Sequence, residues 1–319
     1  MTKITIRMNV SALQQLEQWL SLSETEQDDI VKQLEQVFQG EYIHQYTLSY
    51  TNNPSFRIAT FQHRLTELEF NLIIGGQFNM GLSVQEEEAF RDLVHRDGLE
   101  EDYFFSFIDM MKPAHQVRVR PFLMSRLPIL NSFTREHLEF DIDEYISNYE
   151  VDDDWEEKLL PASLTREQVN VLMEKFNFSL PSEAQWEYAY RGGTATLFYW
   201  GNDLCIDEDK FAICEFSNPE ICRKAANPFG LVGMLVGEWC EDSYYPDYSQ
   251  ASDQDLPLIG RSSYVVRGGA ARLSPWQGCG EWLTCVSAMR LWEDDTPESE
   301  LYSGRFVKVI DIETMKDNH

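Results

Sequence analysis

Six cysteines are the side chains in this sequence best suited to nucleophilic or metal-binding chemistry, and all of them fall between residues 205 and 285. They are Cys205, Cys214, Cys222, Cys240, Cys279 and Cys285. In a reducing compartment we expect thiols rather than disulfides. The Cys-x5-Cys spacing of Cys279 and Cys285 leaves two interpretations: a pair of soft ligands for one metal ion, or ordinary cysteines, which are commonly buried and inert. We favour the second.

Other residue types give little support for a metal centre. The six histidines are scattered and show no His-x-x-x-His spacing, so a histidine-built zinc or iron site is not expected. Eleven acidic residues lie between 136 and 157, where there is no Lys or Arg. This run lacks the glycine turn and the set carboxylate spacing of a calcium loop, so we interpret it as a solvated insertion.

A recognition surface is the alternative to catalysis. Residues 270–303 are rich in Trp, Arg and acidic side chains, and Trp and Arg are frequent anchors of protein interfaces. The candidate binding residues are Trp276, Trp282, Arg290, Trp292, Tyr244 and Tyr245. The tryptophans could instead belong to the core, and for Trp239 and Trp282 we favour that interpretation.

The charge balance limits the kinds of partner. The 319 residues include 26 basic and 54 acidic side chains, for a formal charge of −28. Such a charge repels phosphate, so we expect no nucleic acid and no anionic membrane as partner. It favours a basic protein or peptide, or it serves only solubility, which is the commoner case. The sequence shows no signal segment and no run of apolar residues long enough to span a membrane, so we expect a cytoplasmic protein.

The pattern of apolar residues divides the chain into two regions and a tail. Residues 1–64 predict a small, mainly helical region, in which Ser23 and Glu26 form a capping box and residues 46–61 form a strand pair. Residues 65–312 have short predicted strands, many aromatic residues and frequent glycine turns, and residues 313–319 are a tail.

Two helices stand out in the second region. One begins near residue 165. The other begins at Ser182, with Gln185 completing its capping box, and ends at Gly192, where glycine adopts a left-handed conformation easily. Trp186 and Tyr190 lie four residues apart on one face of this second helix, which predicts that they are buried together.

Several motifs keep the order known from one protein family. The segment 180–193, LPSEAQWEYAYRGG, is nearly a consensus copy of the family's most diagnostic stretch. The other motifs are FNLIIGGQFNMG (70–81), PAHQVRV (113–119), YWGN (199–202), NPFGL (227–231), GEWCED (237–242), VRGG (266–269) and SAMR (287–290). Together they resemble the formylglycine-generating enzyme family, also called the sulfatase-modifying-factor family. The resemblance covers about residues 65–310 and implies an α+β, C-type-lectin-like fold with little regular secondary structure.

The resemblance also implies a chemistry from which this sequence departs. Catalytic members oxidise a substrate cysteine to formylglycine with oxygen and a copper(I) ion, which two cysteines four residues apart hold. The first of these is expected on or near Leu273, whereas Cys279 and Cys285 lie several residues later and one residue wider apart. The family's asparagine that helps to bind a structural calcium is missing from residues 234–239. These departures weaken the expectation of a structural calcium ion and of a copper ion held by Cys279 and Cys285.

The remaining motif residues are interpreted as scaffold. They are Trp186, Glu187, Arg191, Arg267, Glu238 and Trp239. Arg267 and Arg290 are planar donors, which we expect to pin loop carbonyls or carboxylates such as those of Glu238 and Glu241. We predict a divergent, non-catalytic member that recognises a protein or peptide. The alternative is a copper-dependent oxidase that forms formylglycine on a client protein.

Overall fold

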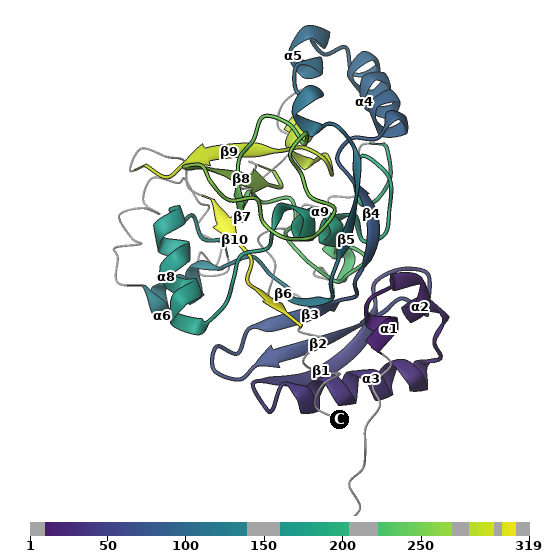
Figure 1. Ribbon diagram of the computed structural model, residues 1–319, viewed down its shortest axis with the longest axis vertical. Helices are drawn as coiled ribbons and strands as arrows, with labels where there is room; N and C mark the ends of the chain where they lie inside the picture. Colours follow the sequence, from purple (N-terminus) through teal and green to yellow (C-terminus); the bar gives the residue numbers. More distant parts are fainter. Residues whose placement is uncertain (1–9, 139–159, 204–222, 270–280, 297–301, 311–319) are drawn as a thin grey trace, which may run out of the picture.

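A computed structural model describes residues 10–138, 160–203, 223–269, 281–296 and 302–310 of the protein (Figure 1). In these ranges three sheets and the surrounding helices are arranged around one central helix, α9 (Glu183–Arg191). The architecture is α+β with long irregular connections, as the sequence motifs imply. No helix in these ranges has the length and apolar character needed to cross a membrane.

The N-terminal region contains the helices and the hairpin that the sequence predicts. Its helices are α1 (Val10–Leu13), α2 (Leu16–Ser21) and α3 (Glu24–Val37), and its strands are β1 (Tyr42–Ser49) and β2 (Arg57–His63). Ser23 and Glu26 form the expected capping box at the start of α3. The two strands pair antiparallel. Helix α3 lies along the sheet that contains them (Figure 1).

This hairpin belongs to a larger sheet of five strands in the order β1-β2-β3-β6-β11. The other members are β3 (Glu69–Ile73), β6 (Phe122–Ser125) and β11 (Val307–Val309). Strand β2 pairs with β3, so hydrogen bonds cross the predicted boundary between residues 64 and 65. That domain boundary, and the tail at 313–319, remain predictions.

Two smaller sheets pack against α9. One has the order β10-β7-β8-β9 and the other pairs β4 with β5. Their strands are β7 (Glu238–Ser243), β8 (Ser263–Arg267), β9 (Leu291–Asp294), β10 (Ser303–Gly304), β4 (Gly76–Met80) and β5 (His115–Val119). The other helical segments are α4 (Val84–Arg96), α5 (Glu101–Phe105), η1 (Asp109–Met111), α6 (Asn131–His137), α8 (Arg166–Phe176) and η4 (Glu281–Cys285).

Helix α9 is buried along its whole length. Ser182 and Gln185 form its capping box, and Gly192 ends it with φ +57°, both as predicted. The rings of Trp186 and Tyr190 stack with centroids 5.1 Å apart, and both are buried, which confirms the shared face. A helix buried on all sides must also bury its charged residues, and each of those needs a partner.

The glycine that ends α9 offers a matched pair of substitutions. Gly192 and Gly98 both have positive φ, but a Cβ at Gly192 would lie 2.7 Å from ring carbons of Pro228, whereas one at Gly98 would meet nothing within 4 Å. We expect Gly98→Ala to lower the free energy of unfolding by about 1–2 kcal/mol through backbone strain. Gly192→Ala should cost about 1–3 kcal/mol more because Pro228 must move. Urea denaturation measures both, and equal losses would contradict this packing.

Candidate functional site

Six charged side chains of alternating sign form one continuous chain of ion pairs through the core. In order they are Glu86, Arg191, Glu187, Arg267, Glu183 and Arg290. All six are nearly inaccessible to solvent. Three carboxylates face three guanidiniums, so the chain of charges is balanced within itself.

The centre of this ion-pair chain is Glu187. One of its carboxylate oxygens lies 2.9 Å from Arg191, and the other lies 2.7 Å from Arg267. Glu187 also accepts the backbone N–H of Gly81 at 2.9 Å. Arg191 continues to Glu86, whose carboxylate completes the capping box of α4. The pairs therefore join α9, β8 and the start of α4.

Glu183 holds the other end of the ion-pair chain. Arg290 donates to both of its carboxylate oxygens, at 2.6 and 2.9 Å, and Arg267 donates to one of them at 2.8 Å. Tyr248 adds a hydroxyl donor at 3.0 Å. Burial alone would raise the pKa of Glu183, but Arg290 and Arg267 outweigh it and hold that pKa below its usual value.

The spacing along α9 explains why one helix supplies so much of the ion-pair chain. Glu183, Glu187 and Arg191 are four residues apart, and residues at this spacing lie on one face of a helix. The two arginines from outside α9 come from β8 and from the residue just before β9.

The arginine partners predicted from the sequence were partly wrong. Arg267 and Arg290 bind carboxylates of α9 rather than those of Glu238 and Glu241. Glu238 pairs with Arg305 at 2.9 Å, and Glu241 pairs with Arg166 at 3.0 Å. The physical reason is the approach of the buried α9 to β8, which sequence order does not indicate. Loop carbonyls are bound as predicted, since Arg290 also donates to backbone oxygens of Met110 and Tyr245.

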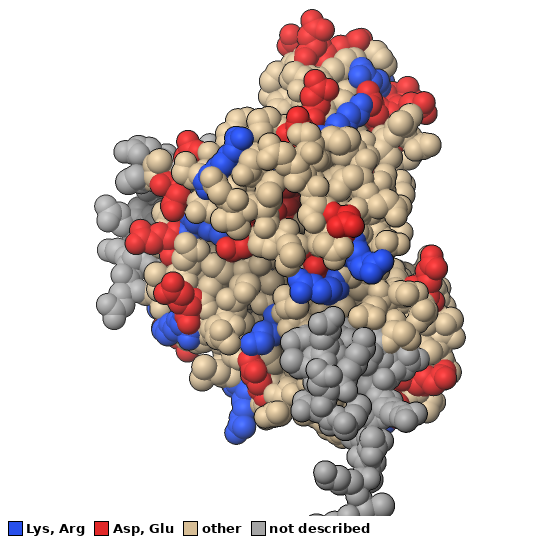
Figure 2. Space-filling model, in the orientation of Figure 1, with Lys and Arg blue, Asp and Glu red and all other residues tan. Residues whose placement is uncertain are grey.

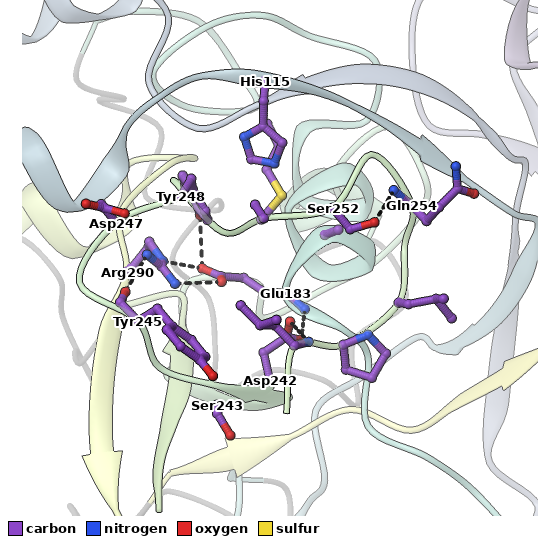
Figure 3. A pocket seen from close by; sticks show the side chains of 16 residues that line it. His115, Glu183, Asp242, Ser243, Tyr245, Asp247, Tyr248, Ser252, Gln254 and Arg290 are labelled. Carbon is purple, nitrogen blue, oxygen red and sulfur yellow. Dashed lines mark hydrogen bonds and ion pairs between the residues drawn. The ribbon is translucent and has the colours of Figure 1, made fainter. Parts of the chain in front are cut away.

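A cavity of about 240 Å³ lies beside the N-terminal end of α9 (Figure 3). Its polar lining includes Glu183, Asp242, Asp247, His115 and Arg290. Its apolar lining is formed by Met80, Ala184, Ala251, Leu256, Pro257 and Leu258. Three carboxyl groups and one guanidinium thus line the cavity.

Asp242 is the one buried carboxylate of the cavity that stands outside the ion-pair chain. It is 6 % exposed, and no Lys, Arg or His in the part of the chain that the structure describes forms an ion pair with it. Its oxygens accept the backbone N–H groups of Glu183 at 2.6 Å and Leu258 at 2.8 Å. Burial and the nearby charge of Glu183 raise its pKa to about 7, although the two amides act in the opposite direction.

His115 presents a polar atom without a hydrogen-bond partner. Its Nδ1 lies 3.0 Å from the carbonyl oxygen of Pro113, which can only accept, so Nδ1 carries the proton of the neutral ring. Nε2 is buried and has no hydrogen-bond partner. Figure 3 shows the ring among the cavity side chains, next to Tyr248, with centroids 5.1 Å apart.

Aromatic side chains lie beside Arg290 and Tyr245, two residues that line this cavity. Tyr244 and Trp292 stack with ring centroids 4.7 Å apart, and Trp292 remains 49 % exposed. The guanidinium of Arg290 lies 5.2 Å from the ring centroid of Tyr244, which links this pair to the cavity. Tyr245 lines the cavity, and Arg261 stacks over its ring at 4.1 Å.

Four of the six predicted binding residues therefore meet in one place, namely Tyr244, Tyr245, Arg290 and Trp292. Trp282 is in the core, where it packs against Phe90 and Phe104, so the core interpretation of this residue is confirmed. Trp276 lies outside the described residues. The cavity residues Asp242 and His115 were not singled out from the sequence, although both lie within quoted motifs.

Of the six cysteines, the structure describes Cys240 and Cys285, and both are free thiols buried in the core. Cys285 is buried, 1 % exposed, at the end of η4, and Cys279 lies outside the described ranges. A copper site that oxygen and a client protein must reach needs an accessible sulfur, and the burial of Cys285 does not fit that requirement. Within the described ranges there is also no group of three His, Cys, Asp or Glu residues that could hold a metal ion.

Comparison with known proteins places this fold among formylglycine-generating-enzyme-like domains. A family model described as the sulfatase-modifying factor enzyme 1-like domain matches residues 56–291. The formylglycine-generating enzyme of Mycobacterium tuberculosis is 34 % identical over 85 residues, which are 22 % of this chain and 28 % of that enzyme. The chain therefore belongs to the sulfatase-modifying-factor family.

Two further matches are a curated protein kinase and a solved structure. The serine/threonine-protein kinase pkn1 of Chlamydia caviae is 38 % identical over 118 residues, which are 35 % of this chain and only 18 % of the kinase. The structure of PvdO from Pseudomonas aeruginosa has a TM-score of 0.52 at 19 % identity and covers 79 % of this chain and 98 % of PvdO. The chain thus spans less than a third of the length of the curated relatives named here, whereas the structural alignment covers almost the whole length of PvdO.

The ion-pair chain predicts a large cost for removing one member. Glu187→Ala leaves two buried guanidiniums without their shared carboxylate, so we expect the free energy of unfolding to fall by about 3–5 kcal/mol. The control is Asp29→Ala, which breaks the solvent-exposed pair with Lys32 and should have little effect. Guanidinium chloride denaturation compares the two variants. Similar losses would mean that the buried pairs do not stabilise the core.

The environment of Asp242 predicts an unusual titration. Its carboxyl should titrate near pH 7, far above the ordinary value in the unfolded chain. The stabilising contribution of this group is then fully present in acid and is lost as the pH rises through about 7. Carbon-13 NMR of the aspartate carboxyls measures the titration, and Asp242→Asn identifies the signal. A midpoint near pH 4 would contradict the proposed environment.

Proposed function

We propose that this protein is a non-catalytic family member that binds a segment of a protein or peptide, favouring a basic partner. The binding surface, here called the cavity face, consists of the cavity beside α9 together with Tyr244, Tyr245 and Trp292. The observation that carries the proposal is the half-exposed Trp292 stacked on Tyr244, connected to the cavity by Arg290. Tryptophan and tyrosine at a concave site are frequent anchors of recognition.

The charge distribution supports a basic partner. Figure 2 shows acidic side chains gathered over the end of the molecule that α4 and α5 form. The exposed acidic residues there are Glu88, Asp92, Asp97, Glu100, Glu101, Asp102 and Asp109. The α4–α5 end is close to the cavity along the chain, because only Lys112, Pro113 and Ala114 separate η1 from His115, which lines the cavity. Negative charge at this end would therefore attract a cationic segment of a partner toward the cavity face.

The copper-dependent oxidase is the second candidate, and no observation in the described residues favours it. Its ligands would be Cys279 and Cys285, of which Cys285 is buried in the core. The test is to measure the affinity for copper(I) by titration of the unchanged protein and of the variants Cys279→Ser and Cys285→Ser. A lost high-affinity site in both variants, together with aldehyde formation on a cysteine peptide, would replace the binding proposal.

Peptide selection tests the cavity face. A phage-displayed library of random peptides is panned on the protein, and enriched peptides are titrated by calorimetry. We expect enrichment in Lys and Arg, and Trp292→Ala should weaken binding by roughly tenfold or more, as truncation of an aromatic anchor does. Raising the salt concentration should weaken binding further, because exposed charges are screened.

The control is Leu65→Ala, which truncates a more exposed apolar side chain, 73 % accessible, between β2 and β3. This variant should bind the selected peptides as well as the unchanged protein does. Peptides that bind all three proteins equally, or that show no preference for basic residues, would overturn the proposed site.

A further inference from the structure

We propose that the partner binds as an additional, antiparallel β-strand on the outer edge of β9, through an extended segment that is basic. This inference rests on the proposed function, because it gives the cavity face a mode of binding. Strand β9 carries Trp292, and it is the outermost strand of the sheet β10-β7-β8-β9 (Figure 1). Adding a strand to such an edge is one of the common ways in which proteins bind extended peptides.

The register of β9 determines which of its backbone groups face outward. Asp295 donates its N–H to the carbonyl oxygen of Ser262 at 3.3 Å, and hydrogen-bonded pairs alternate from there along the antiparallel strands. Glu293 therefore bonds to β8, whereas Trp292 points its N–H and C=O away from β8. No described residue forms a hydrogen bond with either of these two groups of Trp292.

The other outer strands of the two larger sheets are covered or interrupted. Strand β11 exchanges backbone hydrogen bonds with Ser179, and the residue before β10 does so with Leu164. Strand β1 has an irregular register, and there the side chain of Glu35 accepts the backbone N–H of His44. No comparable cover lies over the backbone of Trp292 in the part of the chain that the structure describes.

The side chains of β9 and its end fit a basic partner. Glu293, Asp294 and Asp295 are consecutive, and the last two are exposed. Pairing of β9 with a second copy of itself would bring like charges together across the strands, which is destabilising. Short, charged edge strands resist self-association in this way. A lysine-rich strand would instead place opposite charges beside these carboxylates.

The face on which Trp292 lies indicates where the basic residues of the partner belong. Trp292 and Asp294 alternate with Glu293, so their side chains share one face of the sheet. Trp292 stacks on Tyr244 and is 49 % exposed. A partner residue opposite Trp292 has its side chain on this same face, where a lysine can contact the indole ring. The next alternate residue lies opposite Asp294, so we expect basic residues at alternate positions.

The probe is the octapeptide acetyl-Lys-Val-Lys-Val-Lys-Val-Lys-Val-amide, whose lysines share one face of an extended strand. One derivative is N-methylated on its two inner lysines and the other on its two inner valines. If the lysines lie opposite Trp292 and Asp294, their N–H groups face β9 and the valine N–H groups face solvent. Methylated lysines should therefore weaken binding by about tenfold or more, and methylated valines by less than about twofold.

Titration followed by NMR measures these affinities, and a slip of the peptide by two residues preserves the alternation. Equal weakening by both derivatives would overturn the additional strand. The matched octapeptide with glutamate in place of lysine should not bind. If it binds as tightly as the lysine peptide, the partner is not basic and the proposal is wrong.

Amide hydrogen exchange provides a readout on β9 itself. The N–H of Trp292 should exchange roughly tenfold more slowly in the protein saturated with the octapeptide, because it gains a hydrogen bond. The control is the N–H of Leu65, which lies between β2 and β3 and should exchange at its original rate. An unchanged rate at Trp292 would contradict the proposed strand.

Two substitutions at one position separate the edge from its charge. The backbone N–H of Asp294 faces outward and donates to the side chain of Glu293 at 3.2 Å. Asp294→Asn removes the charge and should weaken octapeptide binding by about twofold to fivefold. Asp294→Pro also removes the N–H and places a ring on the edge, where strands tolerate proline, and it should weaken binding by about tenfold or more. Equal affinities of two folded variants would contradict the proposal, and the methylated peptides test it if the proline variant does not fold.

The two proposals fail in different ways. If both methylated octapeptides bind equally, the additional strand is wrong, and recognition of selected peptides through the side chain of Trp292 can still hold. If only the methylated lysines weaken binding but Trp292→Ala binds selected peptides normally, the additional strand stands and the wider cavity face is wrong. A dimer that Asp294→Pro dissociates would assign this edge to a second copy of the chain and overturn the basic partner.

Discussion

The buried ion-pair chain is the constraint on which the rest of this structure depends. Glu183, Glu187 and Arg191 cannot be placed in the core without partners, because each isolated charge would be strongly destabilising there. Those partners come from α4, from β8 and from the residue before β9, so satisfying one helix fixes the positions of three distant segments. A buried network of this kind specifies one arrangement as much as it stabilises it.

The equal numbers of carboxylates and guanidiniums in the ion-pair chain also determine the charge of the neighbouring cavity. Since its three guanidiniums are fully used by its three carboxylates, Asp242 is left with backbone amides alone. The same close packing that holds α9 in place thus leaves a cavity at its N-terminal end, whose largely apolar lining also includes carboxylates and the histidine His115. Scaffold and candidate site are therefore parts of one electrostatic arrangement.

Family membership explains the scaffold and leaves the chemistry to a few side chains. The family model covers most of the chain, and its motifs supply α9, its capping box and the buried arginines. Motifs that build a fold do not by themselves specify a reaction. Here the cysteine of the predicted pair that the structure describes is buried, whereas the accessible aromatic side chains gather beside the cavity.

The sequence alone predicted the family, the capping boxes of α3 and α9, the hairpin of β1 and β2, and the shared burial of Trp186 and Tyr190. These features follow from local spacing and from motif order, which a sequence displays directly. The partners of Arg267 and Arg290, the meeting of Arg290 with Tyr244 and Trp292, and the cavity around Asp242 and His115 were decided by the tertiary structure. Asp242 and His115 are 127 residues apart in the chain, and no local pattern indicates which carboxylates face which arginines. Only the packing of α9 between the sheets determines which charges are neutralised and which one is left over.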